Sequence, residues 1–299
     1  MIRTEKLLVG TEIKDVGLRE PMGSSMCNDL STLLAERRLL LFRDQDPGPD
    51  DQIRILGAFG NVLDEGRDSS RHSYASGAES SFLSARLPFH LDLHFTQEPL
   101  EVLSLYGESI GDISTPTLFV DAVEAFRRLP SKLAARLADV EMINATYVLW
   151  GDPPDQPSRL SAGYEGAPVG RHPAIMRHPA TGDAFVYVSE LHSHHVIGMQ
   201  KEESDQLIVD VREAIYTAGD IYEHGWRRGD LLIWDNKAIQ HARGPIPNWR
   251  TNPNAPSRSL RRVAVGTKDL YERFLITQEI VDHWASNGVY HSNFQIRSR

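Results

Sequence analysis

Three side chains of metal-binding type stand out in this sequence, two close together and one far along the chain. His90 and Asp92 are separated by one residue, and in a strand such residues point to the same side. His241 follows an apolar run, residues 231–234, that predicts a buried strand. Two imidazoles and one carboxylate on one face of an octahedron, with the opposite positions open, are the ligand set of non-haem Fe(II). The sequence therefore predicts an iron site at these three residues.

Each of these pieces has an ordinary explanation when it is taken alone. With 12 histidines and 41 acidic residues among 299, about 1.6 His-x-acid triplets are expected by chance. His90 and Asp92 would then be surface residues, and His241 would be a hydrogen-bonded histidine in a turn. The iron interpretation depends on the three side chains coming together in space.

A strand-like segment near the end of the chain carries arginines among apolar residues. On strict alternation Arg258, Leu260 and Arg262 share one face of residues 258–265. A guanidinium that faces the protein interior is costly unless it meets an anion, and its fork-like geometry suits a carboxylate. We interpret this segment as a candidate carboxylate site, with a basic turn on an acidic surface as the alternative.

The elements that must position these side chains are short and mostly strand-like. Strands are predicted at residues 39–42, 100–106, 117–120, 143–150, 185–188, 231–234 and 260–265. Helices are predicted at residues 29–37, 50–59, 121–129, 130–140 and 204–216. Many short strands with a few helices indicate a mainly β protein with flanking helices, built on a double-stranded β-helix, or jelly-roll, core.

The chain shows no internal repeat and no linker, so residues 1–299 are predicted to form a single domain. Residues 64–86 are rich in Ser, Arg, Gly and Asp and lack apolar periodicity. They read as a long loop just before His90, and we take them as a candidate lid over the site. Residues 151–170, with several prolines and glycines, read as a second long loop.

Composition narrows the classes of function. A formal net charge of −9 disfavours nucleic acid and anionic membranes as partners, but leaves an anionic small molecule open. The single cysteine, Cys27, excludes an intrachain disulfide and a thiolate cluster. No apolar run approaches the roughly 20 residues that span a bilayer. We expect a cytoplasmic protein that acts on a small molecule, as a monomer or a homo-oligomer.

Several motifs follow one another in a fixed order along nearly the whole chain. The most specific is the segment from Gly229 through Trp234-Asp235-Asn236 to His241. The others are LLLFRDQ at 39–45, FHLDLHF at 89–95, PTLF at 116–119, RHP at 171–173, RHPATG at 177–182 and YVS at 187–189. In this order they resemble the taurine dioxygenase and chlorophenoxyacetate dioxygenase family of Fe(II)/2-oxoglutarate oxygenases.

The resemblance implies a role for each matching residue. His90, Asp92 and His241 would bind iron, and Thr117 would contact a carboxylate of 2-oxoglutarate. Arg262 would pair with the distal carboxylate of 2-oxoglutarate, and Arg258 would approach the iron-proximal carboxylate or an anionic substrate. The stretch from His241 to Arg258 is longer than in the family, which leaves Arg261 as an alternative carboxylate partner.

The resemblance also implies a reaction. Fe(II), 2-oxoglutarate and O₂ would oxidise a substrate C–H bond, by hydroxylation, desaturation or cyclisation, with release of succinate and CO₂. His94, Phe95 and Tyr187 are candidate substrate contacts, with ordinary packing as the alternative for each. His192, His194 and His195 read as a polar loop at the pocket rim rather than as a second metal site. A zinc site, or a non-catalytic jelly-roll binding module, is the alternative function.

Overall fold

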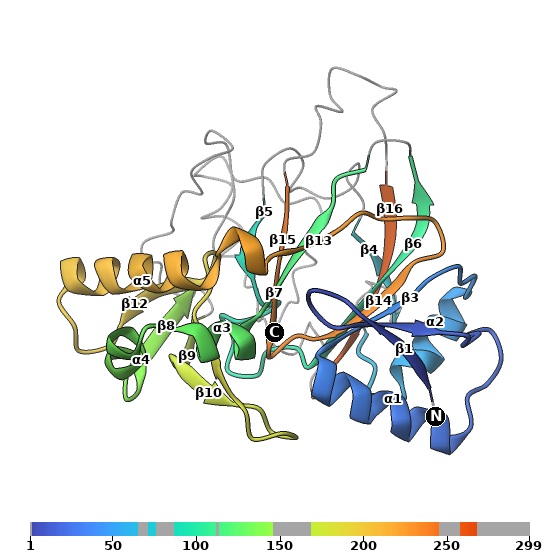
Figure 1. Cartoon of the computed structure of the whole chain (residues 1–299), viewed down its shortest axis with the longest axis horizontal. Helices are drawn as coiled ribbons and strands as arrows, with labels where there is room; N and C mark the ends of the chain where they lie inside the picture. Colours follow the sequence, from blue (N-terminus) through green and yellow to red (C-terminus); the bar gives the residue numbers. More distant parts are fainter. Residues whose placement is uncertain are drawn as a thin grey trace, which may run out of the picture.

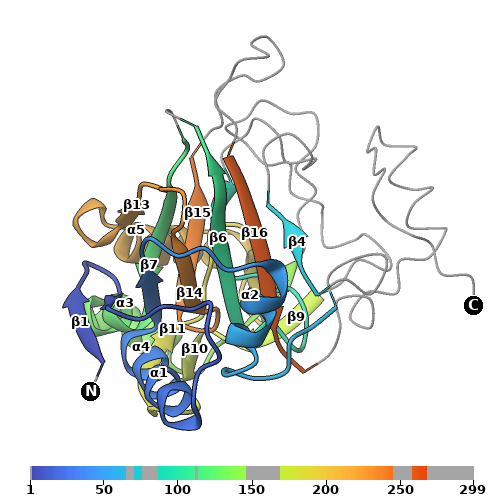
Figure 2. The same ribbon diagram turned by 90° about the vertical axis from the view of Figure 1, so that its right-hand side faces the viewer.

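The computed structural model of the chain is built mainly from β-strands, which form two facing sheets with helices outside them (Figures 1 and 2). It describes residues 2–64, 71–75, 87–111, 114–145, 169–244 and 258–267. The order of the elements matches the alternation of short strands and helices expected from the sequence. The predicted mainly β jelly-roll fold is confirmed.

The larger sheet has seven strands in the described residues, in the order β1-β2-β3-β14-β6-β16-β4. The pairs are antiparallel except β2 with β3, which is parallel. The strands are β1 (Arg3–Lys6), β2 (Thr11–Lys14), β3 (Leu39–Phe42), β14 (Leu231–Asp235), β6 (Val102–Ile110), β16 (Arg258–Val265) and β4 (Ser73–Tyr74).

The smaller sheet carries most of the candidate site. Its described strands are ordered β13-β7-β15-β5, so β15 lies between β7 and β5. They are β13 (Tyr222–His224), β7 (Thr117–Asp121), β15 (Ile239–Arg243) and β5 (Leu87–His90). Of two further small sheets, one has β8 (Glu141–Ala145) between β12 (Ser193–Val196) and β9 (Val169–Pro173), and the other pairs β10 (Ile175–Arg177) with β11 (Ala184–Val186).

Alternation along the strands divides the core into layers. In β3 the side chains of Leu39 and Leu41 face the smaller sheet, where they join Phe119 in one cluster. Leu40 and Phe42 point the other way and pack under the helices. A strand that is covered on both faces has no polar side, which explains why residues 39–42 read as an unbroken apolar run.

The helices cover the outer faces of the two sheets, as Figure 1 shows. Apolar residues of α1 (Ser24–Arg37) and α2 (Pro49–Leu56) pack on the larger sheet. Apolar residues of α3 (Ala122–Arg128), α4 (Ser131–Leu137) and α5 (Lys201–Ile215) pack behind the smaller one. A short 3₁₀ helix, η1 (Ala218–Asp220), precedes β13. None of the helices in the described part of the chain is long and apolar enough to cross a bilayer.

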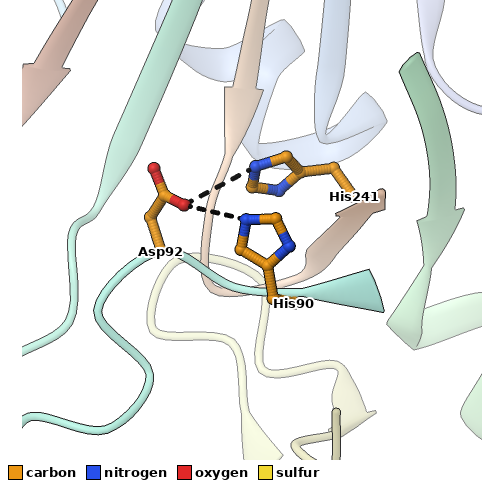
Figure 3. A group of neighbouring side chains, drawn as sticks. All are labelled: His90, Asp92 and His241. Atoms are coloured by element: carbon orange, nitrogen blue, oxygen red, sulfur yellow. Dashed lines mark ion pairs between the residues drawn. The ribbon is translucent and has the colours of Figure 1, made fainter. Parts of the chain in front are cut away.

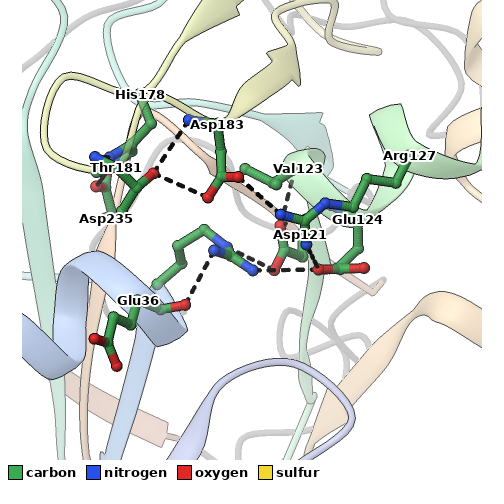
Figure 4. A network of polar contacts seen from close by, with 10 residues as sticks. Glu36, Asp121, Val123, Glu124, Arg127, His178, Thr181, Asp183 and Asp235 are labelled. Carbon is green, nitrogen blue, oxygen red and sulfur yellow. Dashed lines mark hydrogen bonds and ion pairs between the residues drawn. The ribbon is translucent and has the colours of Figure 1, made fainter.

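A network of hydrogen bonds and ion pairs surrounds Asp121, the last residue of β7 (Figure 4). Asp121 caps α3 by accepting hydrogen bonds from the backbone N–H groups of Val123 and Glu124. The same carboxylate forms a buried ion pair with Arg38 at 2.7 Å. Burial raises the pKa of Asp121, and Arg38 opposes that rise. Close by, His178 Nε2 lies 2.6 Å from the Asp235 carboxylate.

Several boundaries differ from the prediction. The first helix begins at Ser24 and not at residue 29, and α2 begins at Pro49 with Gly48 as its N-cap and ends at Leu56, before the predicted end at residue 59. Asp51 accepts a hydrogen bond from the Gly48 backbone N–H. Of the candidate lid, residues 64–86, only 64 and 71–75 are described, and they include β4. The rest of that loop, and all but the last two residues of 151–170, lie outside the described residues.

Candidate metal centre

His90 is the last residue of β5 and is buried. Its Nδ1 lies 2.8 Å from the carbonyl oxygen of Pro88. Because a carbonyl oxygen only accepts, Nδ1 must carry the proton and donate it. The lone pair of this imidazole is therefore on Nε2, which faces Asp92, and a hydrogen bond of this kind is how proteins orient a metal-binding histidine.

His241 lies in the middle of β15, directly opposite His90 on β5 and Phe119 on β7. The rings of the two histidines are 4.2 Å apart between centroids. The register of the smaller sheet thus brings together two residues that are far apart in the sequence. Among the hydrogen bonds formed by the described residues, none involves Nδ1 of His241.

Asp92 is not in a strand, which corrects the argument from period two. The strand β5 ends at His90, and residues 92–95 form turns in which Leu93 has the left-handed φ of 60°. Asp92 reaches the site because its backbone is held by a buried amide. The Asn236 side chain accepts from the Asp92 N–H at 2.9 Å and donates to the Asp92 carbonyl at 3.0 Å. It also donates to the Leu100 carbonyl at 3.0 Å.

The three side chains converge on one point (Figure 3). Asp92 Oδ1 is 3.2 Å from His90 Nε2 and 3.6 Å from His241 Nε2. One ligand atom from each residue lies within 4.8 Å of the others, and among the described residues this is the group that could hold a metal ion. Metal–nitrogen and metal–oxygen bonds of about 2 Å fit this spacing.

The charges of the site favour the metal-binding protonation states. Burial by itself raises the pKa of Asp92, but the guanidinium of Arg262 and the two imidazoles outweigh it and hold the pKa well below its usual range. Burial, and then the neighbouring His90, lower the pKa of His241 to about 3. Near neutral pH the site thus offers an ionised carboxylate and a neutral imidazole, as a metal requires.

The arginines of β16 point to two different faces. Arg262 Nη2 donates to Asp92 Oδ2 at 2.8 Å, which puts this guanidinium beside the metal ligands. Arg258 is buried and donates to the Thr115 carbonyl. Arg261 points to the opposite face, where it bonds Gln52 at 2.8 Å and Glu108 at 2.7 Å. Arg261 is therefore not available to the site.

A second buried guanidinium, which the sequence analysis did not single out, lies near Arg258. Arg243 is the last residue of β15 and is the cross-strand partner of Thr117. Burial lowers the pKa of Arg243 to about 10. Burial, and then the nearby Arg243, lower the pKa of Arg258 to about 9. Both groups remain charged at neutral pH. Thr117 is buried between β13 and β15, and its hydroxyl accepts a hydrogen bond from Trp226 Nε1 at 2.9 Å.

A group of aromatic and imidazole rings continues from the metal ligands. His192 lies edge-on to His90 with centroids 6.1 Å apart, and the Phe95 ring lies 4.9 Å from it. His94 is fully buried, bonds Ser189 at 3.0 Å, and packs edge-on against Tyr187 at 4.3 Å. Phe95 thus packs against His192, which adjoins the metal ligand His90. His94 and Tyr187 pack against each other.

The three histidines read as a rim loop separate from one another. His192 is 5% exposed, and its Nδ1 donates to the Ala145 carbonyl at 3.1 Å, so it is an interior residue beside His90. Burial, and then His90, lower the pKa of His192 to about 3. His194 and His195 are half-buried on β12, where they contact each other through their Nδ1 atoms. The rim interpretation is wrong for His192.

The fold and the site together define a jelly-roll protein with a metal centre of two histidines and one carboxylate. A model of the family described as "Taurine catabolism dioxygenase TauD, TfdA family" matches residues 3–264. The chain belongs to this family. The predicted family is confirmed, and so is the enzyme class, a dioxygenase that requires Fe(II), 2-oxoglutarate (alpha-ketoglutarate) and O₂.

Individual relatives show the same likeness. The chain is 26% identical over 259 residues to the alpha-ketoglutarate-dependent 2,4-dichlorophenoxyacetate dioxygenase of Cupriavidus pinatubonensis, which covers 78% of this chain and 88% of that protein. It is 23% identical over 254 residues to the alpha-ketoglutarate-dependent sulfonate dioxygenase of Saccharomyces cerevisiae, with 78% and 60% covered. The crystal structure of a taurine dioxygenase from Burkholderia xenovorans superposes with a TM-score of 0.73 at 19% identity, covering 89% and 91%.

Proposed function

We propose that this dioxygenase uses His90, Asp92 and His241 to hold Fe(II) and oxidises a C–H bond of a small anionic metabolite. The observation that carries the proposal is the convergence of these three ligand atoms within 4.8 Å, with an arginine-bearing strand beside them. When bound, the iron supplies the activation of O₂ that no side chain can provide. The chain's own residues bind and orient the reactants.

For the cosubstrate, the geometry supports roles that reverse the expectation for the two arginines. Arg262 contacts Asp92 and is therefore at the metal end, so we propose it for the iron-proximal carboxylate. Arg258 is buried at the start of β16, four residues from Arg262, and we propose it for the distal carboxylate together with Thr117. Because Thr117 Oγ1 accepts from Trp226, its own O–H is left to donate to an anion.

For the substrate, the rings next to His90 support a pocket wall. We propose that Phe95 and His192 contact the substrate, because they adjoin each other and His192 adjoins a metal ligand. His94 and Tyr187 would then support this wall from behind, since both are almost fully buried. Phe95 offers an apolar face to the substrate, and the edge-on His192 ring extends it toward His90.

The sequence as a whole supports proposals about the domain organisation, the cellular location and the partners of the enzyme. We propose that residues 1–299 act as one domain in the cytoplasm, with the loop at 64–86 as a lid, and with neither nucleic acid nor membrane as partner. The net charge of −9 supports the last point. Whether the enzyme is a monomer or a homo-oligomer is tested by its mass in solution. A zinc-dependent or purely binding function is less well supported, because it gives Arg258 and Thr117 no anion to bind.

One titration tests the central proposal. Anaerobic addition of Fe(II) and then 2-oxoglutarate is expected to produce a visible charge-transfer band, which His90→Ala abolishes. Release of succinate is then followed across a panel of small carboxylates, sulfonates and sulfate esters. Binding of Fe(II) without any binding of 2-oxoglutarate would refute the proposed function.

A further inference from the structure

His178 and Asp235 form a buried contact that the proposed function does not use (Figure 4). His178 Nε2 lies 2.6 Å from Asp235 Oδ2. Nδ1 of the same ring accepts hydrogen bonds from the backbone N–H groups of Ala180 at 3.3 Å and Thr181 at 3.2 Å. A ring nitrogen that accepts carries no proton, so the proton is on Nε2 and is donated to the carboxylate. His178 is therefore a neutral imidazole held in one tautomer.

The loop that carries His178 joins β10 to β11 and is closed by its own backbone. The His178 N–H donates to the Asp183 carbonyl at 2.8 Å, and the Gly182 N–H donates to the His178 carbonyl at 2.8 Å. Gly182 has the left-handed φ of 74°, which a glycine adopts without strain. The imidazole thus extends toward Asp235 from a loop of defined shape.

Asp235 in turn shapes the chain that follows β14. Its Oδ1 accepts a hydrogen bond from the Lys237 N–H at 2.8 Å, and its carbonyl accepts one from the Ala238 N–H at 3.3 Å. Asn236 lies inside this turn, and its side chain holds the backbone of Asp92. The position of the Asp235 carboxylate therefore helps to determine where that amide points.

The same turn shares a core cluster with the segment that carries two of the metal ligands. Ala238 and Leu91 are fully buried and belong to one cluster, together with Phe185 and Tyr187. Leu91 is the middle residue of the segment 90–92. A displaced turn would therefore disturb this segment in two ways, through the amide contact and through the packing of the cluster.

We propose that His178 is a positioning residue of the metal centre, which acts through Asp235 and Asn236. The Nε2 proton of the imidazole fixes the Asp235 carboxylate, and the carboxylate sets the turn that presents the amide to Asp92. A buried carboxylate that loses one of its donors turns toward another partner, because a charge without hydrogen bonds is costly in the interior. The proposal rests on the proposed function, because it assumes that Asp92 binds the metal.

Two amide substitutions separate the two nitrogens of His178. In His178→Gln the amide N–H₂ reaches the position of Nε2 and keeps a donor for Asp235. In His178→Asn the shorter amide reaches only the position of Nδ1, where its oxygen accepts from the loop backbone. In calorimetry we expect His178→Asn to weaken Mn(II) binding about tenfold, with His178→Gln within about threefold of wild type. Arg127→Met, which removes an exposed ion pair with Asp183 of the same loop, is the control that should keep the wild-type affinity.

A second measurement uses the metal-free protein. Hydrogen exchange of the Asp92 N–H, followed by NMR, reports whether the Asn236 amide still holds this backbone. We expect exchange to be about tenfold faster in His178→Asn and unchanged in His178→Gln. A role that is confined to the loop would speed exchange only within residues 178–183.

The outcomes decide the proposal separately from the proposed function. Faster Asp92 exchange and weaker Mn(II) binding in His178→Asn, both restored in His178→Gln, support it. Equal values in the two variants, or wild-type values in His178→Asn, overturn it. If His178→Asn does not fold, Asp235→Asn replaces it, since its one oxygen can serve only one of the two donors, and the same criteria apply. Wild-type protein that does not bind Mn(II) would overturn the proposed function, whereas the exchange of Asp92 would still decide the role of His178.

Discussion

Replacing Asn236 by alanine removes the amide that holds the loop of Asp92. The side chain is fully buried and makes three hydrogen bonds, two to the Asp92 backbone and one to the Leu100 carbonyl. Each polar group left without a partner in the interior costs about 1–3 kcal/mol. Three such groups, with some relief from local relaxation, give an expected loss of about 3–5 kcal/mol in the free energy of unfolding.

The effect on the metal is expected to exceed a general loss of stability. Asp92 lies in a turn next to Leu93, whose φ is left-handed. No helix or strand therefore holds the backbone of Asp92 once the Asn236 amide is gone. Loss of a group that orients a metal ligand typically weakens metal binding about tenfold to a hundredfold. The assay is a calorimetric titration with Mn(II) at a temperature where circular dichroism shows the variant to be folded.

Two further variants serve as a comparison and a control for Asn236→Ala. Asn236→Asp retains an acceptor for the Asp92 N–H but loses the donor to two carbonyls, so its metal affinity should also fall. Asn61→Ala removes an exposed amide far along the chain and should change neither quantity. A folded Asn236→Ala protein with wild-type Mn(II) affinity would refute the role of this amide in positioning Asp92.

Three further changes test other parts of the structure. Arg261→Met should lower the free energy of unfolding by about 1–3 kcal/mol, because it leaves the buried Gln52 amide oxygen without its donor, yet leave 2-oxoglutarate affinity unchanged; urea melts and calorimetry check this, and a changed affinity would show that Arg261 reaches the site. Gly170→Ala should lower the Tm, because a Cβ there would lie 2.7 Å from the Thr96 carbonyl oxygen; an unchanged Tm would contradict this close approach of the two backbones. The metal-free protein should lose stability as the pH falls from about 6.5 to 3, because the pKa of His241 is about 3 when folded against 6.5 when unfolded, so the unfolded state binds more protons. His241→Phe should reduce the slope of stability against pH by up to about 1.4 kcal/mol per unit in urea melts, and an unaltered slope is the contrary result.

The sequence predicted the strands whose two faces are both covered and the side chains that are chemically distinctive. Residues 39–42 and 231–234 are apolar without a break, and they are β3 and the first four residues of β14. His90, Asp92 and His241 could be selected because few residue types bind iron and because their order matched a family. These inferences depend on residue type and local spacing, which a sequence states directly.

The contacts that make the site work could not be predicted in the same way. Asn236 holds a backbone 144 positions away, so its role depends on a long-range packing that no local pattern encodes. The argument that placed Asp92 in a strand reached the right residue by a wrong route, because β5 ends two residues earlier. Arg243 could have been found by applying alternation to residues 239–243, since it shares a face with His241.

The net charge near the metal ligands is positive, whereas that of the whole chain is negative. This difference affects how strongly the metal and 2-oxoglutarate bind. The chain carries −9, whereas among the described residues Arg243, Arg258, Arg262 and Asp92 together sum to two positive charges near the metal ligands. A divalent metal alone would raise this to four, and a dicarboxylate would return it to two. Because excess charge is costly in a partly buried site, each reactant should tighten the other, and the coupling is reciprocal. Mn(II) that binds equally well with and without 2-oxoglutarate would contradict this argument.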